Sequence, residues 1–236
     1  AWTDGAGDEG PMTIDEAYGA YTNGGYGACA ILLKTGTYAP ATRLWVRSTF
    51  VMSGGLAGVD NHTKSAPDAK SVLDGRGVVD LVNVERIPDA DTAYFRGIEF
   101  RRAYSTALRK TDVKYGGVNY SGGVDVDGCR FADNAPDYST ADTRYAYASA
   151  IQAFVDGGAA RKSKFRCANT LFDGNVTTNT SGEAGYAWGS TMVVNIKDIG
   201  SAEFVGCQFV TNGIPFTQKL GVPPSGAPRH SPFAAS

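Results

Sequence analysis

Two acidic residues, Asp125 and Asp127, alternate with Val124 and Val126 in the segment Gly122-Gly-Val-Asp-Val-Asp-Gly128. In an extended strand alternate side chains share a face, so both carboxylates are predicted to point outward while the valines point inward. Paired carboxylates can bind Ca²⁺, or serve as general acid and base at a glycosidic bond. The alternative interpretation is an ordinary strand with a polar outer face.

Arg101 and Arg102 follow Phe100 and add two cations to this candidate chemistry. A polysaccharide lyase needs a base that removes the proton α to a uronate carboxylate and a cation that stabilises the enolate. With Asp125 and Asp127 as the carboxylates, these four residues form the candidate catalytic set of a lyase or hydrolase. The alternative is that they are solvated surface charges.

Other chemistries find little support in the composition. The chain has no Cys-x-x-Cys, only two histidines (His62 and His230) and no Gly-x-Ser-x-Gly, so neither a zinc site nor a nucleophile elbow is expected. With 22 Lys+Arg against 24 Asp+Glu, no basic stripe favours nucleic acid as a partner. The longest apolar run, residues 28–33, is far shorter than the ~20 residues of a transmembrane segment. We therefore expect no cofactor, apart from Ca²⁺ at the paired carboxylates.

A repeated motif predicts what positions these residues. Segments 93–100, 124–131, 165–172 and 202–209 align without gaps. One column of the alignment contains Phe95, Val126, Cys167 and Phe204, a second contains Ile98, Cys129, Thr170 and Cys207, and a third contains Phe100, Phe131, Phe172 and Phe209. Between the first two columns lie Gly97, Gly128, Asn169 and Gly206, residue types that tolerate the left-handed backbone of a corner between strands.

The last three motifs continue with an asparagine three residues after the phenylalanine, at Asn134, Asn175 and Asn212. Like columns recur in register when parallel strands stack at about 4.8 Å. The rings then stack, and the asparagine amides can hydrogen-bond along the same axis. We therefore predict an all-β parallel β-solenoid of about seven coils, at that strand spacing.

The two ends of the chain differ from this middle part. Thr13-Ile-Asp-Glu16 is a capping box and predicts a helix over about 13–22, which would cover the apolar end of the first coil and block its strand edge. We predict an extension over 1–12, the solenoid domain over 13–215, and a tail or cap rich in Pro, Gly and Ser over 216–236. The last coil is left unfinished, so a strand edge is exposed there.

The cysteines are interpreted as small buried side chains. Cys129 and Cys207 share a column with Thr170 between them, so they lie two coils, or about 10 Å, apart, beyond the reach of a disulfide. Cys167 belongs to a different column, and Cys29 lies inside an apolar run.

Aromatic side chains near the variable loops supply candidate binding residues: Tyr145, Tyr147, Tyr186 and Trp188. Exposed rings stack on sugars and anchor protein interfaces, whereas rings in strand register belong to the core. Together with Asn134, Asn175 and Asn212, they form the candidate binding set.

These motifs resemble the repeats of polymorphic outer membrane proteins, which are autotransporter-like passengers. Those repeats pair Phe-x-x-Asn with a Gly-Gly-Ala strand, to which Gly-Gly-Val at 116–118 and 122–124 is similar. Further likenesses are residues 30–40 to the Gly-Thr-Tyr coil that opens such passengers, 52–58 to a Gly-Gly turn, and 72–75 to a Leu-Asp-Gly strand. The resemblance implies a right-handed, pectin-lyase-like parallel β-helix that is exported to the cell surface or secreted.

The first functional hypothesis is thus an extracellular structural or adhesive module that binds a host or matrix protein, a carbohydrate or a neighbouring subunit. The second is a lyase or hydrolase of acidic polysaccharide. The third is a subunit of a filament or sheath that self-associates through the ends of its helix.

Overall fold

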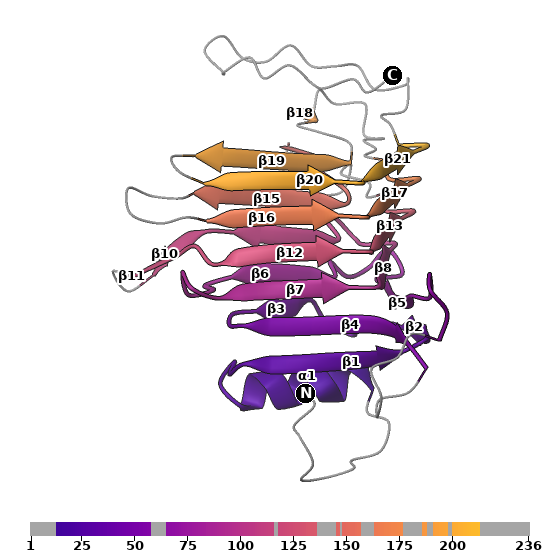
Figure 1. Ribbon diagram of the computed structural model, residues 1–236, viewed down its shortest axis with the longest axis horizontal. Coiled ribbons are helices and arrows are strands. Elements are labelled where there is room, and N and C mark those ends of the chain that lie inside the picture. The colour runs from indigo at the N-terminus through magenta and orange to yellow at the C-terminus, as the bar shows by residue number, and fades with distance from the viewer. Residues whose placement is uncertain are drawn as a thin grey trace.

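The computed structural model describes residues 13–57, 65–115, 118–135, 145–146, 148–156, 163–176, 186–187, 191–197 and 200–212. The predicted segments 1–12 and 216–236 lie outside these residues, as do His62, His230, Tyr147 and Trp188. The regular structure of the described chain is mostly β-strand, wound into a stack that begins on one short helix (Figure 1).

The helix is α1 (Ile14–Asn23), and the strands follow it in chain order. They are β1 (Cys29–Lys34), β2 (Gly36–Tyr38), β3 (Leu44–Val46), β4 (Phe50–Leu56), β5 (Ser71–Asp74), β6 (Val82–Glu85), β7 (Thr92–Arg96), β8 (Ile98–Arg101), β9 (Leu108–Thr111), β10 (Val113–Tyr115), β11 (Val118–Tyr120), β12 (Gly123–Asp127), β13 (Arg130–Ala132), β14 (Tyr145–Ala146), β15 (Ile151–Asp156), β16 (Lys164–Ala168), β17 (Leu171–Asp173), β18 (Tyr186–Ala187), β19 (Met192–Lys197), β20 (Ser201–Val205) and β21 (Gln208–Val210).

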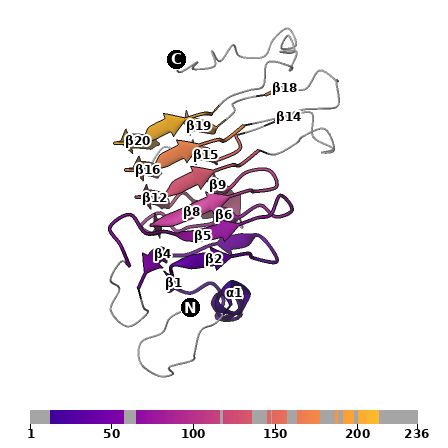
Figure 2. The same cartoon turned by 90° about the vertical axis from the view of Figure 1, so that its right-hand side faces the viewer.

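Three parallel sheets make up the body of the molecule, and each turn of the chain adds one strand to each sheet. Sheet A has the order β1-β4-β7-β12-β16-β20, sheet B the order β2-β5-β8-β13-β17-β21, and sheet C the order β3-β6-β9-β15-β19. Figure 2 shows the strands of sheet B one above another. The described residues therefore form a parallel β-helix, as the sequence predicts.

The described residues form six coils, fewer than the seven or so that the sequence predicts. Residues 43–52 do not make a separate coil, because they contain β3, which ends the first coil, and β4, which begins the second. The early coils lack the phenylalanine motif, so no repeated residue marks where one turn of the chain ends.

The repeated columns lie in register, as predicted. Phe131 pairs with both Phe100 and Phe172, and Phe172 pairs with Phe209. The successive ring centroids of this column are 4.7, 5.1 and 4.6 Å apart, with the planes within 11° of parallel. The first three rings are fully buried, whereas Phe209 is 51% exposed because it lies on the last described coil.

A left-handed residue joins sheet A to sheet B in four successive coils. Gly97, Gly128, Asn169 and Gly206 have φ values of 60°, 60°, 49° and 63°. An ordinary side chain is strained in this region, and glycine and asparagine tolerate it best. These are the corner residues that the alignment predicts.

The asparagines of the motif form a hydrogen-bonded ladder. The Nδ2 atom of Asn134 donates to Oδ1 of Asn175 at 2.8 Å, and Nδ2 of Asn175 donates to Oδ1 of Asn212 at 3.0 Å. The same three amides donate to the carbonyl oxygens of Phe100, Phe131 and Phe172 respectively. Each asparagine side chain thus donates a hydrogen bond to a backbone carbonyl of the preceding coil.

Helix α1 lies across the N-terminal end of the stack (Figure 1). The hydroxyl oxygens of Tyr18 and Tyr21 accept hydrogen bonds from the backbone N–H groups of Trp45 and Arg47, at 2.8 and 2.9 Å. These tyrosines therefore replace the strand that would otherwise pair with β3. Thr13 and Glu16 close the predicted capping box at the start of the helix.

The phenylalanine column leads to a first prediction. Truncating Phe172 to alanine leaves a cavity between two stacked rings, so we expect the free energy of unfolding to fall by about 3–5 kcal/mol. Denaturant titration measures this loss. The same truncation at the half-exposed Phe209 is the control and should cost clearly less. A loss below about 1 kcal/mol at Phe172, far under the range for a buried phenylalanine, contradicts a packed column.

The asparagine ladder leads to a second prediction. Asn175→Ala leaves the carbonyl of Phe131 and the amide of Asn134 each without one partner, and a buried polar group in that state costs about 1–3 kcal/mol. Asn212→Ala, in the last coil, is the control and should lose less, because Asn212 is part-exposed. Equal effects on the urea midpoint at both positions contradict a buried ladder.

Candidate functional site

The predicted carboxylates lie on the outer face of sheet A. Val124 and Val126 are buried, and Asp125 and Asp127 point outward, as the alternation predicts. Arg166, on the next coil, contacts both: its Nη1 atom lies 3.1 Å from Asp125 Oδ1 and 3.5 Å from Asp127 Oδ2. Asp127 also accepts a hydrogen bond from Asn169 Nδ2 at 3.0 Å. The two carboxylates therefore share Arg166, which belongs to the later basic cluster of residues 161–166 that the sequence also offers as a source of the cation.

The predicted arginines lie at the far end of sheet B. Arg101 ends β8 and pairs with Asp133 at 3.0 Å. Arg102 begins the next corner, with a φ of 48°, and pairs with Asp74. Each arginine thus has an aspartate partner at its own corner, and no contact among the described residues joins this pair to Asp125 or Asp127. The lyase set remains a hypothesis whose members lie on two sheets.

The predicted binding residues are divided by burial. Asn134 and Asn175 have no exposed surface, so a ligand cannot reach their side chains in this fold. Tyr145 and Tyr186 are register partners in the short β14–β18 pairing, and only their backbones lie within the described part of the chain. Asn212 is part-exposed at the open end of the ladder.

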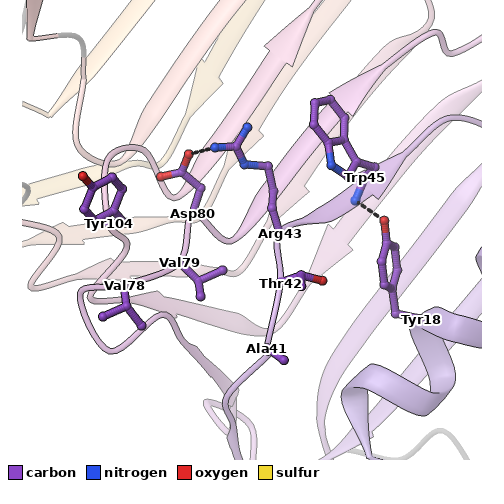
Figure 3. A pocket seen from close by; sticks show the side chains of 9 residues that line it. All are labelled: Tyr18, Ala41, Thr42, Arg43, Trp45, Val78, Val79, Asp80 and Tyr104. Carbon is purple, nitrogen blue, oxygen red and sulfur yellow. Dashed lines mark hydrogen bonds and ion pairs between the residues drawn. The ribbon is translucent and has the colours of Figure 1, made fainter. Parts of the chain in front are cut away.

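A cleft that the sequence did not predict lies beside helix α1, where three successive coils pass from sheet B to sheet C. Its volume is about 460 Å³, within the usual size of a small-molecule site. Figure 3 shows its lining: Tyr18, Ala41, Thr42, Arg43, Trp45, Val78, Val79, Asp80 and Tyr104. The helix, the first coil, the second coil and the third coil each contribute part of the wall.

Asp80 organises this cleft. Its carboxylate pairs with Arg43, and Oδ1 accepts hydrogen bonds from the backbone N–H and hydroxyl of Ser105 at 2.7 and 2.5 Å and from the N–H of Thr106 at 3.3 Å. The side chain is only 7% exposed. Both carboxylate oxygens thus have partners within the wall of the cleft, which ties Arg43 to the turn at Ser105 and Thr106.

Aromatic rings provide the apolar surface of the cleft. The hydroxyl of Tyr18 accepts the N–H of Trp45, which ties the helix to β3 beneath the cleft. The Arg43 guanidinium lies 5.6 Å from the centre of the Trp45 ring, a cation–π distance. Tyr104 is 47% exposed at the opposite wall and is held by the bond from its N–H to the carbonyl of Val79. Three aromatic residues and an ion pair thus line the cleft.

The signal for this cleft in the sequence is weak. Its residues come from four separate segments, and none belongs to a repeated column. The pattern Arg43-x-Trp45 places an arginine and a tryptophan on one face of a strand, but only the pitch of the helix brings Asp80 and Tyr104 to the same place.

Comparison with family models, with curated proteins and with solved structures finds no match. Within the described ranges, no helix has the length and apolar character needed to cross a membrane. The same residues contain no group of three or more His, Cys, Asp or Glu side chains that could hold a metal ion. The site is therefore interpreted from its own geometry.

The Asp74–Arg102 pair leads to a prediction of pH dependence. Burial raises the pKa of Asp74, but the Arg102 guanidinium and the N–H of Arg76 outweigh this effect and hold the pKa below its usual value. A lowered folded-state pKa gives stability that is complete above the ordinary aspartate pKa of about 3.9 and is lost as the pH falls through the lowered value.

Arg102→Gln should therefore lower the unfolding midpoint at neutral pH, and the gap to the wild type should close in acid. Arg96→Gln is the matched control, because the Arg96 guanidinium lies over the Tyr94 ring, 5.4 Å from its centre, rather than beside a carboxylate. Urea titrations across the acid range measure both gaps. A gap for Arg102→Gln that stays constant with pH contradicts the role given to the pair.

Proposed function

We propose that this protein is an extracellular binding module, a parallel β-helix that holds a carbohydrate in the cleft of Tyr18, Trp45 and Tyr104 without transforming it. The observation that carries the proposal is the composition of that cleft. Flat aromatic faces suit the C–H face of a sugar ring, and the Arg43–Asp80 pair offers hydrogen bonds to hydroxyl groups at its edge.

The arrangement of charges favours binding over catalysis. Asp80 is saturated by four hydrogen-bond donors, and the carboxylates of sheet A share Arg166. General acid–base catalysis needs a carboxyl that can exchange a proton with the substrate. Neither group is placed for that exchange, so we rank the lyase or hydrolase hypothesis second.

The location outside the cell belongs to the same proposal. It is supported by the resemblance of the Phe-x-x-Asn motifs to those of polymorphic outer membrane proteins, whose passengers act at the cell surface. An adhesive role follows from a rigid rod that presents a sugar-binding cleft to a matrix or to another cell.

A panel of soluble neutral and uronate-containing polysaccharides tests this function. We expect at least one polymer to change the intrinsic tryptophan fluorescence in a saturable way, through contact with Trp45. Tyr104→Ala should weaken binding by about tenfold or more, equivalent to about 1.4 kcal/mol. The control is Tyr94→Ala, a tyrosine on the outer face of sheet A, which should leave binding unchanged.

Three outcomes would overturn the proposal. The first is a panel with no binder, and the second is an equal loss of affinity at Tyr94 and Tyr104. The third is a rise in ultraviolet absorbance on a uronate polymer, since an unsaturated product identifies a lyase.

Self-association is a second candidate, favoured by one observation at the far end of the stack. Phe204, Val205, Phe209 and Val210 are each between 42% and 51% exposed, and β20 and β21 are the last strands of their sheets. Because α1 covers the N-terminal end of the stack, two copies are expected to pair through their C-terminal ends rather than stack head to tail. Sedimentation across a concentration series tests this candidate, which predicts a dimer and is contradicted by a monomer at every concentration.

A further inference from the structure

Two cysteines meet where the last coil is joined to the coil before it. Cys167 lies in β16, and Cys207 lies at the corner between β20 and β21. Their Sγ atoms are 3.8 Å apart, and the Cys207 thiol also donates to the backbone carbonyl of Cys167 at 3.4 Å. Both are free thiols in the structure. The two residues stand in different columns of the repeat, as the alignment predicts, but the corner turns the Cys207 side chain toward the neighbouring column.

We propose that Cys167 and Cys207 form a dithiol site that a low-molecular-weight disulfide oxidises to an intramolecular disulfide, joining the fifth coil to the sixth. A disulfide holds its sulfurs at about 2.05 Å, so the two atoms must approach by less than 2 Å. Cys207 lies between β20 and β21, outside the paired strands, so the proposal places this movement in the Cys207 side chain and leaves the strand register unchanged.

The two thiols differ in access. Cys167 is fully buried, while Cys207 is part-exposed. Burial and the neighbouring Cys207 thiol raise the pKa of Cys167, so this thiol keeps its proton at neutral pH until a reaction partner is in place. Cys207 is therefore the sulfur that meets an oxidant from solvent.

The exchange proceeds in two balanced steps. Cys207 loses its proton to water, and its thiolate attacks one sulfur of the oxidant; the S–S bond of the oxidant breaks, and one thiolate leaves and is protonated. Cys167 then gives up its proton and attacks Cys207 Sγ, and the second oxidant thiol is released. Two protein thiols are oxidised by two electrons, and one small disulfide is reduced to two thiols.

The disulfide would link the last described coil covalently to the coil before it. Strands β20 and β21 pair on one side only, with β16 and β17. A disulfide here closes a loop of 40 residues between positions 167 and 207, which restricts the unfolded chain and holds the last coil against the stack. This inference is independent of the carbohydrate cleft, which lies at the opposite end.

The experiment uses the full chain and oxidised glutathione as the oxidant. After incubation under native conditions, the protein is quenched in acid, denatured and titrated for thiols, and its peptides are mapped by mass spectrometry. We expect the number of thiols to fall from four to two, with one cross-linked peptide pair that contains Cys167 and Cys207. The unfolding midpoint of the oxidised protein should exceed that of the reduced protein.

Two variants keep the result specific. Cys207→Ser should retain its three thiols and yield no cross-link, whereas the matched control Cys29→Ser, in the first coil, should still lose two thiols and form the cross-link. The proposal is overturned if the wild type keeps four thiols, if Cys207 carries only a glutathione adduct, or if the cross-link joins Cys129. Because the wild-type measurement stands alone, a variant that fails to fold does not remove the test.

Discussion

Stacking of one coil on the next, in register, is the constraint on which the whole molecule depends. Each turn of the chain must present the same inward column to the turn before it, and the phenylalanines meet this requirement with nearly parallel rings 4.6–5.1 Å apart. The rings continue toward the N-terminus through Phe95 and Phe50 to Tyr21 of α1, with centroids 5.3–6.0 Å apart. Buried asparagines hold the neighbouring corner at the same pitch. Ring stacking and amide hydrogen bonds therefore require the same spacing between coils, and a change of register in one would disrupt the other.

Charges on the outer faces follow this same repeat. Arg166 lies between Asp125 and Glu203 in one outward column of sheet A, and Arg130 contacts both Glu99 and Asp173 on sheet B. Opposite charges on successive coils attract, while like charges directly opposite each other destabilise a sheet. The carboxylates that first suggest catalysis thus have an architectural partner one coil away, which is why their spacing alone is a weak sign of an active site.

The sequence predicts those features that repeat along the axis and fails for those that do not. The columns containing Phe131 and Cys167, the left-handed corner at Asn169 and the capping helix all follow from local residue types, because each is specified within a few positions. The number of coils was overcounted, since the first two turns lack the marker phenylalanine. The cleft of Trp45 and Tyr104 and the contact of Cys207 with Cys167 were missed because each depends on the pitch and on the direction of a corner, which join residues from separate turns.

The two kinds of corner differ in how much change they accept. From the third coil onward, sheet A passes to sheet B through a single left-handed residue, whereas the second coil takes residues 57–70 for the same step. The path from sheet B to sheet C runs from residue 101 to 108 in the third coil, from 132 to 151 in the fourth and from 173 to 192 in the fifth. In these last coils the first corner therefore keeps a constant length while the second, along one flank, becomes longer. Evolution can diversify that flank without disturbing the core, much as antibodies vary their loops on a fixed framework. The cleft borders the same flank, so its lining residues can change without altering the stacked columns of the core.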